Sequence, residues 1–415
     1  MVTVEEEFDG AVGTPPAAGD YRVIVGPQHP THKEPMRWTF YVTGEKIEAV
    51  GLRLGYNHRG IEKAFEQRTW LQNLYLAERL CGICSNAHQL AYVNVCEKLA
   101  NLYDEVPERA KYLRVLVHEM ERIHSHLLYY GVLAHDAAFD SFWHLVWRDR
   151  EIIMDLCEKI TGNRVNYAFP TMGGARRDVT PEQAREYIQD LKILRKKVEG
   201  HKKWAEKERT FYVRLKDVVP LSREKALKYC AVGPTARASG VPWDVRKDDP
   251  FEVWDKLDWK RVVYHGCDLY DTMRVRIDET FQSIDQCIQC LEWLQDNPGD
   301  IRIRFPARIP PNEVVHHVEA QRGEDIHYGR SNGTAQPDRY KIRAPTLANL
   351  PSLCYRLKGA YVADIPVAIR SIDPCIGCCE RIAIVKTDER KVMLMTTDEI
   401  RARGRRFYKH GSPIF

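Results

Sequence analysis

Three Cys-x-x-Cys pairs are the residues of this sequence best suited to metal chemistry: Cys81 with Cys84, Cys287 with Cys290, and Cys375 with Cys378. Two thiolates at this spacing converge on one metal when the backbone turns between them. Each outer pair contains a glycine, whereas the middle pair lies within an amphipathic helical pattern. We therefore expect the outer pairs to bind a metal, and Cys287 and Cys290 to be buried helix thiols.

The remaining cysteines have no partner at a metal-ligand spacing. The sequence has 12 cysteines among 415 residues, which is too few for a disulfide scaffold, and its acidic N-terminus carries no secretory signal. We expect a reducing compartment and ordinary core thiols at Cys96, Cys157, Cys230, Cys267 and Cys354. Cys379 directly follows the last pair.

A structural zinc site is the alternative use of four thiolates. Zinc ribbons and fingers draw their ligands from one short segment, whereas the outer pairs lie near opposite ends of this chain. A chain of this length also buries an ample core without a zinc staple. Four soft thiolates from distant segments suit a buried redox metal, and spacing alone goes no further.

Charge and hydropathy exclude other classes of protein. Lys and Arg number 62 and Asp and Glu 58, a net charge of +4, without the basic excess of a dedicated nucleic-acid binder. No apolar run approaches the roughly 18 residues that a membrane span needs. The composition is that of a globular protein with a substantial core.

The elements that must position the cysteines form an α+β pattern. β-branched and aromatic residues predict strands at 21–25 and 37–42, joined by a loop over 26–35. Residues 301–370 are predicted to be strands and loops. Apolar periodicity predicts helices over 71–102, 110–133, 142–160, 181–208 and 262–294. We expect a central bundle of long helices with β-rich N-terminal and C-terminal pieces.

We divide the chain into an arm, one domain and a tail. Residues 1–20, rich in glycine and proline, predict a flexible arm, and 21–381 a single large domain. In the tail, 382–415, residues 382–385 predict a strand and 397–405 a helix.

Both outer cysteine segments resemble motifs of the nickel–iron hydrogenase large subunits. These motifs are Arg79-Leu80-Cys81-Gly82-Ile83-Cys84 with His88 beyond it, and Asp373-Pro374-Cys375-x-x-Cys378. Residues 59–62 resemble the family's Arg-Gly-x-Glu motif. Residues 319–324 resemble its Pro-Arg-Gly segment, with Gln321 where proline is usual.

Other segments resemble the 49-kDa subunit family of respiratory complex I, the NADH-quinone oxidoreductase, which is similar to hydrogenase large subunits but has lost the cysteines. These segments are 26–30, 107–110, 126–128, 237–240 and 341–345. A complex I framework with all four cysteines resembles the catalytic large subunit of membrane-bound, energy-converting hydrogenases, of the Ech, CO-induced and formate hydrogenlyase type. The resemblance runs from Tyr21 to Arg381.

The resemblance implies a binuclear centre of nickel and iron, the iron carrying CO and cyanide ligands. Cys81 and Cys375 would be terminal nickel ligands, and Cys84 and Cys378 would bridge the two metals. The implied reaction is proton reduction to H2, or its reverse, with low-potential electrons from a ferredoxin-type donor and coupled ion translocation.

The same resemblance implies roles for the polar residues nearby. Glu62 would carry protons, since a carboxylate can exchange them with its neighbours. His88 would donate a hydrogen bond to a bridging sulfur, and Arg322 would face a cyanide ligand or the open metal position. Asp373 would cap the second cysteine loop or hold an arginine, and Arg79 would help to bind the centre.

Several of these residues also have an ordinary interpretation. Glu62 would form an ion pair with Arg59 or Lys63, His88 would be a packed histidine, and Arg322 would pair with Glu319 or Glu324 at the surface.

A second group, His29, His32 and Asp136, matches the region around the quinone headgroup in complex I. We interpret these residues as candidates for proton delivery near the membrane arm. The alternative is a surface histidine loop.

Electrons have to leave a buried metal, and the sequence shows no further four-cysteine motif. The resemblance implies a small subunit with a [4Fe-4S] cluster, ferredoxin-like iron–sulfur subunits and integral membrane subunits of an ion-pumping arm. The chain would be peripheral, on the cytoplasmic side of the membrane.

Two further interpretations stay open. A complex I-like relative would reduce quinone or sulfur, and a zinc-stapled subunit would be purely structural. Residues 379–381 match the place where a maturation protease cuts some members of the family, so the tail is either removed or retained.

Overall fold

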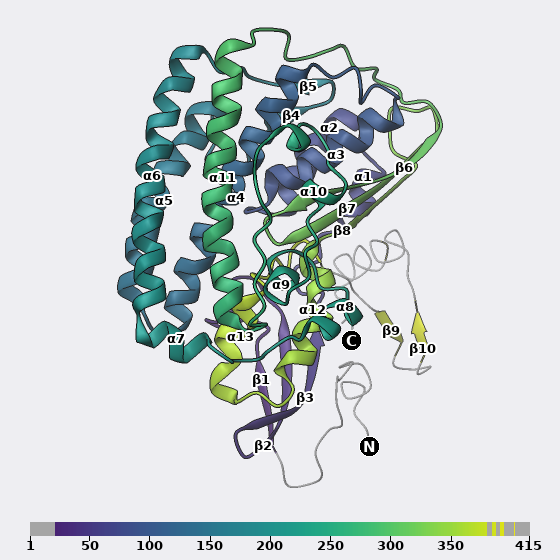
Figure 1. The fold of residues 1–415 in the computed structure, drawn as a ribbon. Helices are drawn as coiled ribbons and strands as arrows, with labels where there is room; N and C mark the ends of the chain where they lie inside the picture. Colours follow the sequence, from purple (N-terminus) through teal and green to yellow (C-terminus); the bar gives the residue numbers. More distant parts are fainter. Residues whose placement is uncertain (1–20, 380–383, 387–390, 394–401, 403–415) are drawn as a thin grey trace.

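The computed structural model describes residues 21–379, 384–386, 391–393 and 402. Four long helices lie side by side and form one side of the molecule (Figure 1): α4 (Glu108–Asp136), α5 (Asp140–Thr161), α6 (Pro181–Lys207) and α11 (Leu269–Asp296). Helices α4 and α6 each contact both α5 and α11. The expected α+β fold with a central bundle is confirmed, with α11 beginning at Leu269, where the Asp268 side chain caps its first turn.

Helix α4 packs against α5 and α11 and is buried almost all round. Its buried charges are paired with neighbouring elements. Arg114 pairs with Glu97 at 2.6 Å, and Glu119 accepts from Arg246 at 3.0 Å. Burial of such charges is tolerated only when each finds a partner, so the pairs fix how α4 sits among its neighbours.

Two antiparallel three-stranded sheets confirm the β-rich pieces. The first has the order β1 (Tyr21–Val25), β2 (Arg37–Thr43), β3 (Lys46–Arg53). The second has the order β6 (Asn312–Ala320), β7 (Gly323–Ser331), β8 (Arg339–Arg343) and packs against α3 (Ser85–Leu99) through β6 and β7. Alternate residues of β7 point inward, as a half-buried strand requires.

The single helix expected over 71–102 is wrong, because the first cysteine pair interrupts it. The segment consists of α2 (Trp70–Ala77), a short 3-10 turn, η1 (Glu78–Leu80), and α3. Between them, the Cys81 sulfur accepts hydrogen bonds from the backbone N–H groups of Ile83 and Cys84, both at 3.3 Å. These bonds replace helical ones and turn the backbone as a metal-binding pair requires.

The strands and loops expected over 301–370 are only partly correct. The segment also contains α12 (Pro345–Leu357), η3 (Val362–Asp364) and α13 (Ile365–Ser371). Each of the two α-helices carries a proline in its first turn, where the missing N–H costs nothing. After α13, Asp373 adopts a φ of 51° and turns the chain into the second cysteine loop.

Shorter elements complete the described chain. They are α1 (Ile61–Phe65), β4 (Pro170–Thr171), β5 (Gly174–Ala175), α7 (Arg209–Leu215), α8 (Arg223–Lys228), α9 (Gly233–Ala238), α10 (Val245–Asp248), η2 (Trp254–Lys256), β9 (Ile384–Lys386) and β10 (Lys391–Met393). The strand expected at 382–385 overlaps β9. The arm 1–20, the helix expected at 397–405 and the candidate cut at residues 380–381 lie outside the described residues. None of the described helices is long and apolar enough to cross a membrane.

Candidate metal centre

The four outer cysteines meet at one buried point, although they come from opposite ends of the chain. Their sulfur atoms all lie within 4.8 Å of one another. Cys375 Sγ is 3.0 Å from Cys81 Sγ and 2.8 Å from Cys378 Sγ. All four are free thiols. A buried set of four soft sulfur donors fits nickel and iron, and it also fits zinc.

Cys81 is the cysteine of this cluster whose ionised form is most stabilised. Hydrogen bonds from the Cys375 thiol, and then from those of Cys378 and Cys84, hold the pKa of Cys81 well below its usual value. Burial, by contrast, raises the pKa of Cys378 well above its usual value. Among the four, Cys81 is therefore the cysteine whose pKa is shifted toward the thiolate, the form that binds metals.

Glu34 is the functional candidate that the sequence reasoning missed. Its carboxylate accepts hydrogen bonds from the backbone N–H groups of Ile376 and Gly377, the latter at 3.1 Å. Burial, and then the neighbouring Cys81, raise the pKa of Glu34. Glu34 lies in the 26–35 loop, which also carries His29 and His32. Its place beside these two histidines was the one sequence feature that could have marked it as a candidate. The result is an easily protonated carboxylate against the cysteine loop.

Arg59 joins the two cysteine loops. Its guanidinium donates to the carbonyl oxygens of Arg79 and Leu80, both at 2.8 Å, and of Gly377 at 3.2 Å. A Cβ atom on Gly377 would lie 2.9 Å from the Glu34 carboxylate and 3.1 Å from Arg59, so a larger residue would displace these contacts. The Arg59 guanidinium thus holds both loops. Lys63, the other cation expected to pair with Glu62, donates to Glu66.

The side chain of Arg79 does not face the cluster. It is 56% exposed and pairs with Glu78. Only the backbone carbonyl of Arg79 takes part in holding the cysteine loops, through its bond to Arg59. The structure therefore gives the Arg79 guanidinium no place at the centre.

Arg322 lies beside the cysteines and is held there by Asp373. It is 1% exposed, and its Nη2 lies 2.8 Å from the Asp373 carboxylate, so the surface ion pair with a neighbouring glutamate is wrong. Despite burial, Asp373 and then Cys84 and Cys81 raise the pKa of Arg322. Its Nη1 has no hydrogen-bond partner among the described residues, which leaves a donor for a ligand of the centre.

His88 lies one turn into α3, as its spacing from Cys84 predicts, but its contacts differ from those expected. Nδ1 lies 2.8 Å from Asp325 and 3.1 Å from His327, and Nε2 has no hydrogen-bond partner among the described residues. The hydrogen bond to a sulfur is therefore not formed in this structure. Although burial disfavours the charged ring, the Asp325 carboxylate raises the pKa of His88.

Glu62, in α1, bonds to strand β8. Its carboxylate accepts from Lys341 at 2.7 Å and from the Ile342 N–H at 3.1 Å, and its side chain is 23% exposed. The ordinary interpretation of Glu62 as one half of an ion pair is therefore right in kind, but the partner is Lys341.

Glu121 anchors the start of α3, and no pattern in the sequence marks it. It accepts from the N–H groups of Asn86 at 2.6 Å and Ala87 at 3.0 Å, next to Cys84. Gln321 donates to it at 2.8 Å. Burial raises the pKa of Glu121 to about 7. This contact explains why a glutamine serves at 321, since proline has no side-chain donor.

The second predicted group is brought together through Arg370. Arg370 lies 2.7 Å from the Asp136 carboxylate and donates to the Thr31 carbonyl at 3.1 Å. His29 is exposed, and its Nδ1 accepts from the Thr31 N–H. Burial, and then His29, lower the pKa of His32 to about 4. Asp136 and the histidine loop are therefore neighbours.

The remaining cysteines are mostly core thiols, as expected. Cys287 and Cys290 are fully buried on α11, and burial raises the pKa of both. The core interpretation is wrong for Cys230 and Cys267, which are exposed and half-buried. Both have positive φ values and lie outside the helices.

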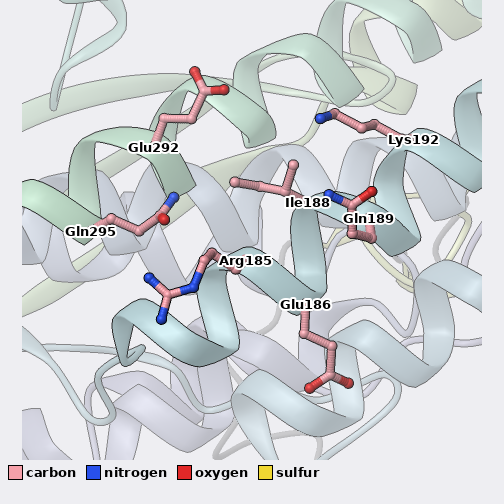
Figure 2. Close-up of a pocket in the computed structure, with 7 residues that line it drawn as sticks. All are labelled: Arg185, Glu186, Ile188, Gln189, Lys192, Glu292 and Gln295. Atoms are coloured by element: carbon pink, nitrogen blue, oxygen red, sulfur yellow. The ribbon is translucent and has the colours of Figure 1, made fainter.

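A surface groove offers a different kind of site. Figure 2 shows it between α6 and α11, lined by charged, amide and apolar side chains: Arg185, Glu186, Ile188, Gln189, Lys192, Glu292 and Gln295. It includes none of the cysteines or their partners, so the candidate chemistry lies in the buried cluster.

Comparisons with known proteins agree with this geometry. The family described as the respiratory-chain NADH dehydrogenase 49 Kd subunit matches residues 136–308 and 301–381. The nickel-dependent hydrogenase family matches residues 59–140, which contain the first cysteine pair.

Similar proteins include two hydrogenases. The chain is 40% identical to membrane-bound hydrogenase subunit alpha of Pyrococcus furiosus, over 91% of each chain. It is 37% identical to the carbon monoxide-induced hydrogenase of Rhodospirillum rubrum, over 87% of this chain and 99% of that protein.

A solved structure is also similar. It is that of the membrane-bound sulfane sulfur reductase, an archaeal respiratory membrane complex, with a TM-score of 0.83 and 30% identity over 88% of this chain and 100% of that one. The chain therefore belongs to the family that unites the 49-kDa subunit of respiratory complex I with the large subunits of membrane-bound nickel–iron hydrogenases.

Proposed function

We propose that this chain is the catalytic subunit of a membrane-bound [NiFe] hydrogenase that reduces protons to H2, or oxidises H2, with low-potential electrons from a ferredoxin-type donor. The observation that carries the proposal is the convergence of four buried cysteine sulfurs within 4.8 Å. The 49-kDa relatives share the framework, so the donor set is what favours a metal centre over a quinone site, and the 40% identity to a membrane-bound hydrogenase subunit favours hydrogen chemistry.

The four sulfurs would hold nickel and an iron with CO and cyanide ligands. Cys81 and Cys375 would be terminal ligands of nickel, and Cys84 and Cys378 would bridge. When bound, the centre supplies the two-electron chemistry of H2, which side chains lack. Arg322 would direct its Nη1–H groups at a ligand of the iron or at the open metal position, since Asp373 holds its other edge and Nη1 has no hydrogen-bond partner among the described residues.

Protons would be handled by the chain itself. A cysteine thiolate of the cluster would accept the proton first, and Glu34, whose carboxylate interacts with Cys81, would take it onward. Contact with the cysteine loop favours Glu34 over Glu62 as the first carrier. His32, His29 and Asp136 would continue the route, since the two histidines share the loop that carries Glu34 and Arg370 joins Asp136 to that loop.

His88 would tune the centre from beside it. Its Nδ1 is occupied by Asp325 and His327, so Nε2 is the nitrogen available to donate toward a bridging sulfur.

Partners complete the function. Among the described residues, groups of three or more potential metal ligands occur only at the cysteine cluster and at a His–Asp–His group. Electrons would leave through a small subunit with a [4Fe-4S] cluster and ferredoxin-like subunits. Membrane subunits would couple the reaction to ion translocation, with this chain on the cytoplasmic side.

Sulfur reduction is the second candidate. It is favoured by the similarity to the sulfane sulfur reductase structure. Sulfur can also be reduced at a thiolate-bound metal, so the cysteine cluster alone does not separate the two reactions.

Paired activity assays on the purified complex test the choice. We expect H2 evolution from reduced ferredoxin, with little sulfide formed from polysulfide under the same conditions. Cys378→Ser should abolish H2 evolution, whereas Cys290→Ser, a matched change in a buried Cys-x-x-Cys pair, should not. Sulfide formation without H2 evolution would favour sulfur reduction. If the complex shows neither activity, the structural zinc site is the interpretation that remains.

A further inference from the structure

A second group of potential metal ligands lies where α3 packs against β7. His88 comes from α3, and Asp325 and His327 are inward-facing neighbours on β7. His88 Nδ1 is 2.8 Å from Asp325 Oδ2, His327 Nε2 is 3.2 Å from the same oxygen, and the two nitrogens are 3.1 Å apart. Three potential metal-ligand atoms, two imidazole nitrogens and one carboxylate oxygen, therefore lie close together.

The carboxylate of this group is buried without hydrogen bonds. Asp325 is fully buried, and neither of its oxygens has a hydrogen-bond partner among the described residues, although both imidazoles lie close. A buried carboxylate without a hydrogen bond costs several kcal/mol unless a cation compensates it. Within the described part of the chain, Asp325 forms its ion pairs with the two histidines.

The spacing of the three atoms suits a small divalent cation. Zinc binds histidine nitrogen and carboxylate oxygen at about 2.0–2.2 Å, which places neighbouring ligand atoms about 3 Å apart. His327 also meets a second condition, because its Nδ1 is hydrogen-bonded to the Tyr340 hydroxyl at 2.8 Å. Such a bond on the other ring nitrogen fixes the tautomer of a ligating histidine.

We propose that His88, Asp325 and His327 form a zinc site, distinct from the cysteine centre and built from different ligands. Zinc on His88 Nδ1 places the ring proton on Nε2, the nitrogen that lacks a partner among the described residues. The ion neutralises Asp325 and joins α3, which follows the first cysteine loop, to β7, which follows Arg322. The site shares no ligand with the proposed nickel–iron centre, so its test does not depend on hydrogenase activity.

Zinc analysis of the purified complex tests the site. We expect one zinc per copy of this chain beyond the zinc of any partner, measured as the difference between wild type and Asp325→Asn. Nickel should be unchanged in the variant. Asp338→Asn, the same substitution at a partly exposed residue paired with Arg330, is the matched control and should retain zinc.

X-ray absorption at the zinc edge gives a readout on the unmodified protein. We expect nitrogen and oxygen neighbours at about 2.0–2.1 Å, with imidazole scattering and no sulfur at about 2.3 Å. Sulfur neighbours would put the zinc in the cysteine cluster and overturn the site. Wild-type protein without zinc, or zinc unaffected by Asp325→Asn in a folded variant, would leave only a buried imidazolium–carboxylate pair and overturn it as well.

Discussion

Replacing Glu34 by glutamine removes its charge and its ability to carry a proton while keeping its shape. A glutamine oxygen can still accept from the Ile376 and Gly377 N–H groups that the carboxylate bonds. Hydrogen bonds to a charged group are worth about 1.5–3 kcal/mol and neutral ones about 0.5–1.5 kcal/mol. Two weakened bonds therefore cost about 2–3 kcal/mol, which a chain of this size tolerates, and the cysteine loop should keep its conformation.

Loss of a positioned proton carrier reduces a rate by about 10²–10⁴-fold. We expect Glu34→Gln to lower H2 evolution by about 100-fold or more, with nickel content unchanged. Glu62→Gln is the control, because the Glu62 carboxylate bonds Lys341 and the Ile342 N–H of β8. It should retain activity within a few-fold.

Two assays report on proton delivery to the centre. Gas chromatography measures H2 formed with a dye or ferredoxin as electron donor, and mass spectrometry measures isotope exchange between D2 and water. Exchange into water should fall with H2 evolution in Glu34→Gln. A near-wild-type Glu34→Gln together with an inactive Glu62→Gln would refute the assignment and restore Glu62 as the carrier.

Further predictions concern the ligands, the arginine and the histidines. Cys375→Ser should abolish nickel binding and H2 activity, whereas Cys287→Ser should leave both nearly intact; loss of metal in the latter would overturn our choice of cysteine pairs. Arg322→Lys should retain nickel but lose at least about tenfold in activity, because lysine cannot bond Asp373 and present a second N–H edge together; full activity would exclude a role for the guanidinium. Burial lowers the pKa of His118 and His126 to about 4. Because the unfolded chain takes up these protons near pH 6.5, folded-state stability should fall by up to about 3 kcal/mol per histidine between pH 6.5 and 4. Thermal unfolding of the complex across that pH range measures this loss of stability. A melting temperature that rises as the pH is lowered from 6.5 to 4 would contradict the prediction.

Local patterns in the sequence predicted much of the fold. The helix predicted over 181–208 is α6, Pro181–Lys207, begun by Thr180 with both bonds of a capping box, and the strands 21–25 and 37–42 form as expected, since capping and β-branched runs act over a few residues. The long helix over 71–102 was wrong because apolar periodicity is blind to the hydrogen bonds that the Cys81 sulfur accepts.

The residues of the candidate site likewise fall into those that the sequence predicted and those that only the structure shows. The cysteine pairs carry a spacing that predicts metal binding by itself, and the structure brings them together. Glu34 and Glu121 have no such spacing, because their importance arises from contacts with residues far along the chain. Asp325 likewise becomes noticeable only when β7 is packed against α3.

Infrared spectroscopy of the purified, active complex, with nickel quantified in the same sample, tests the central claim most directly. We predict absorption bands of CO and cyanide bound to iron, together with one nickel per copy of this chain, and the loss of both in Cys375→Ser. Active complex with neither these bands nor nickel would contradict the assignment of Cys81, Cys84, Cys375 and Cys378 to a nickel–iron centre.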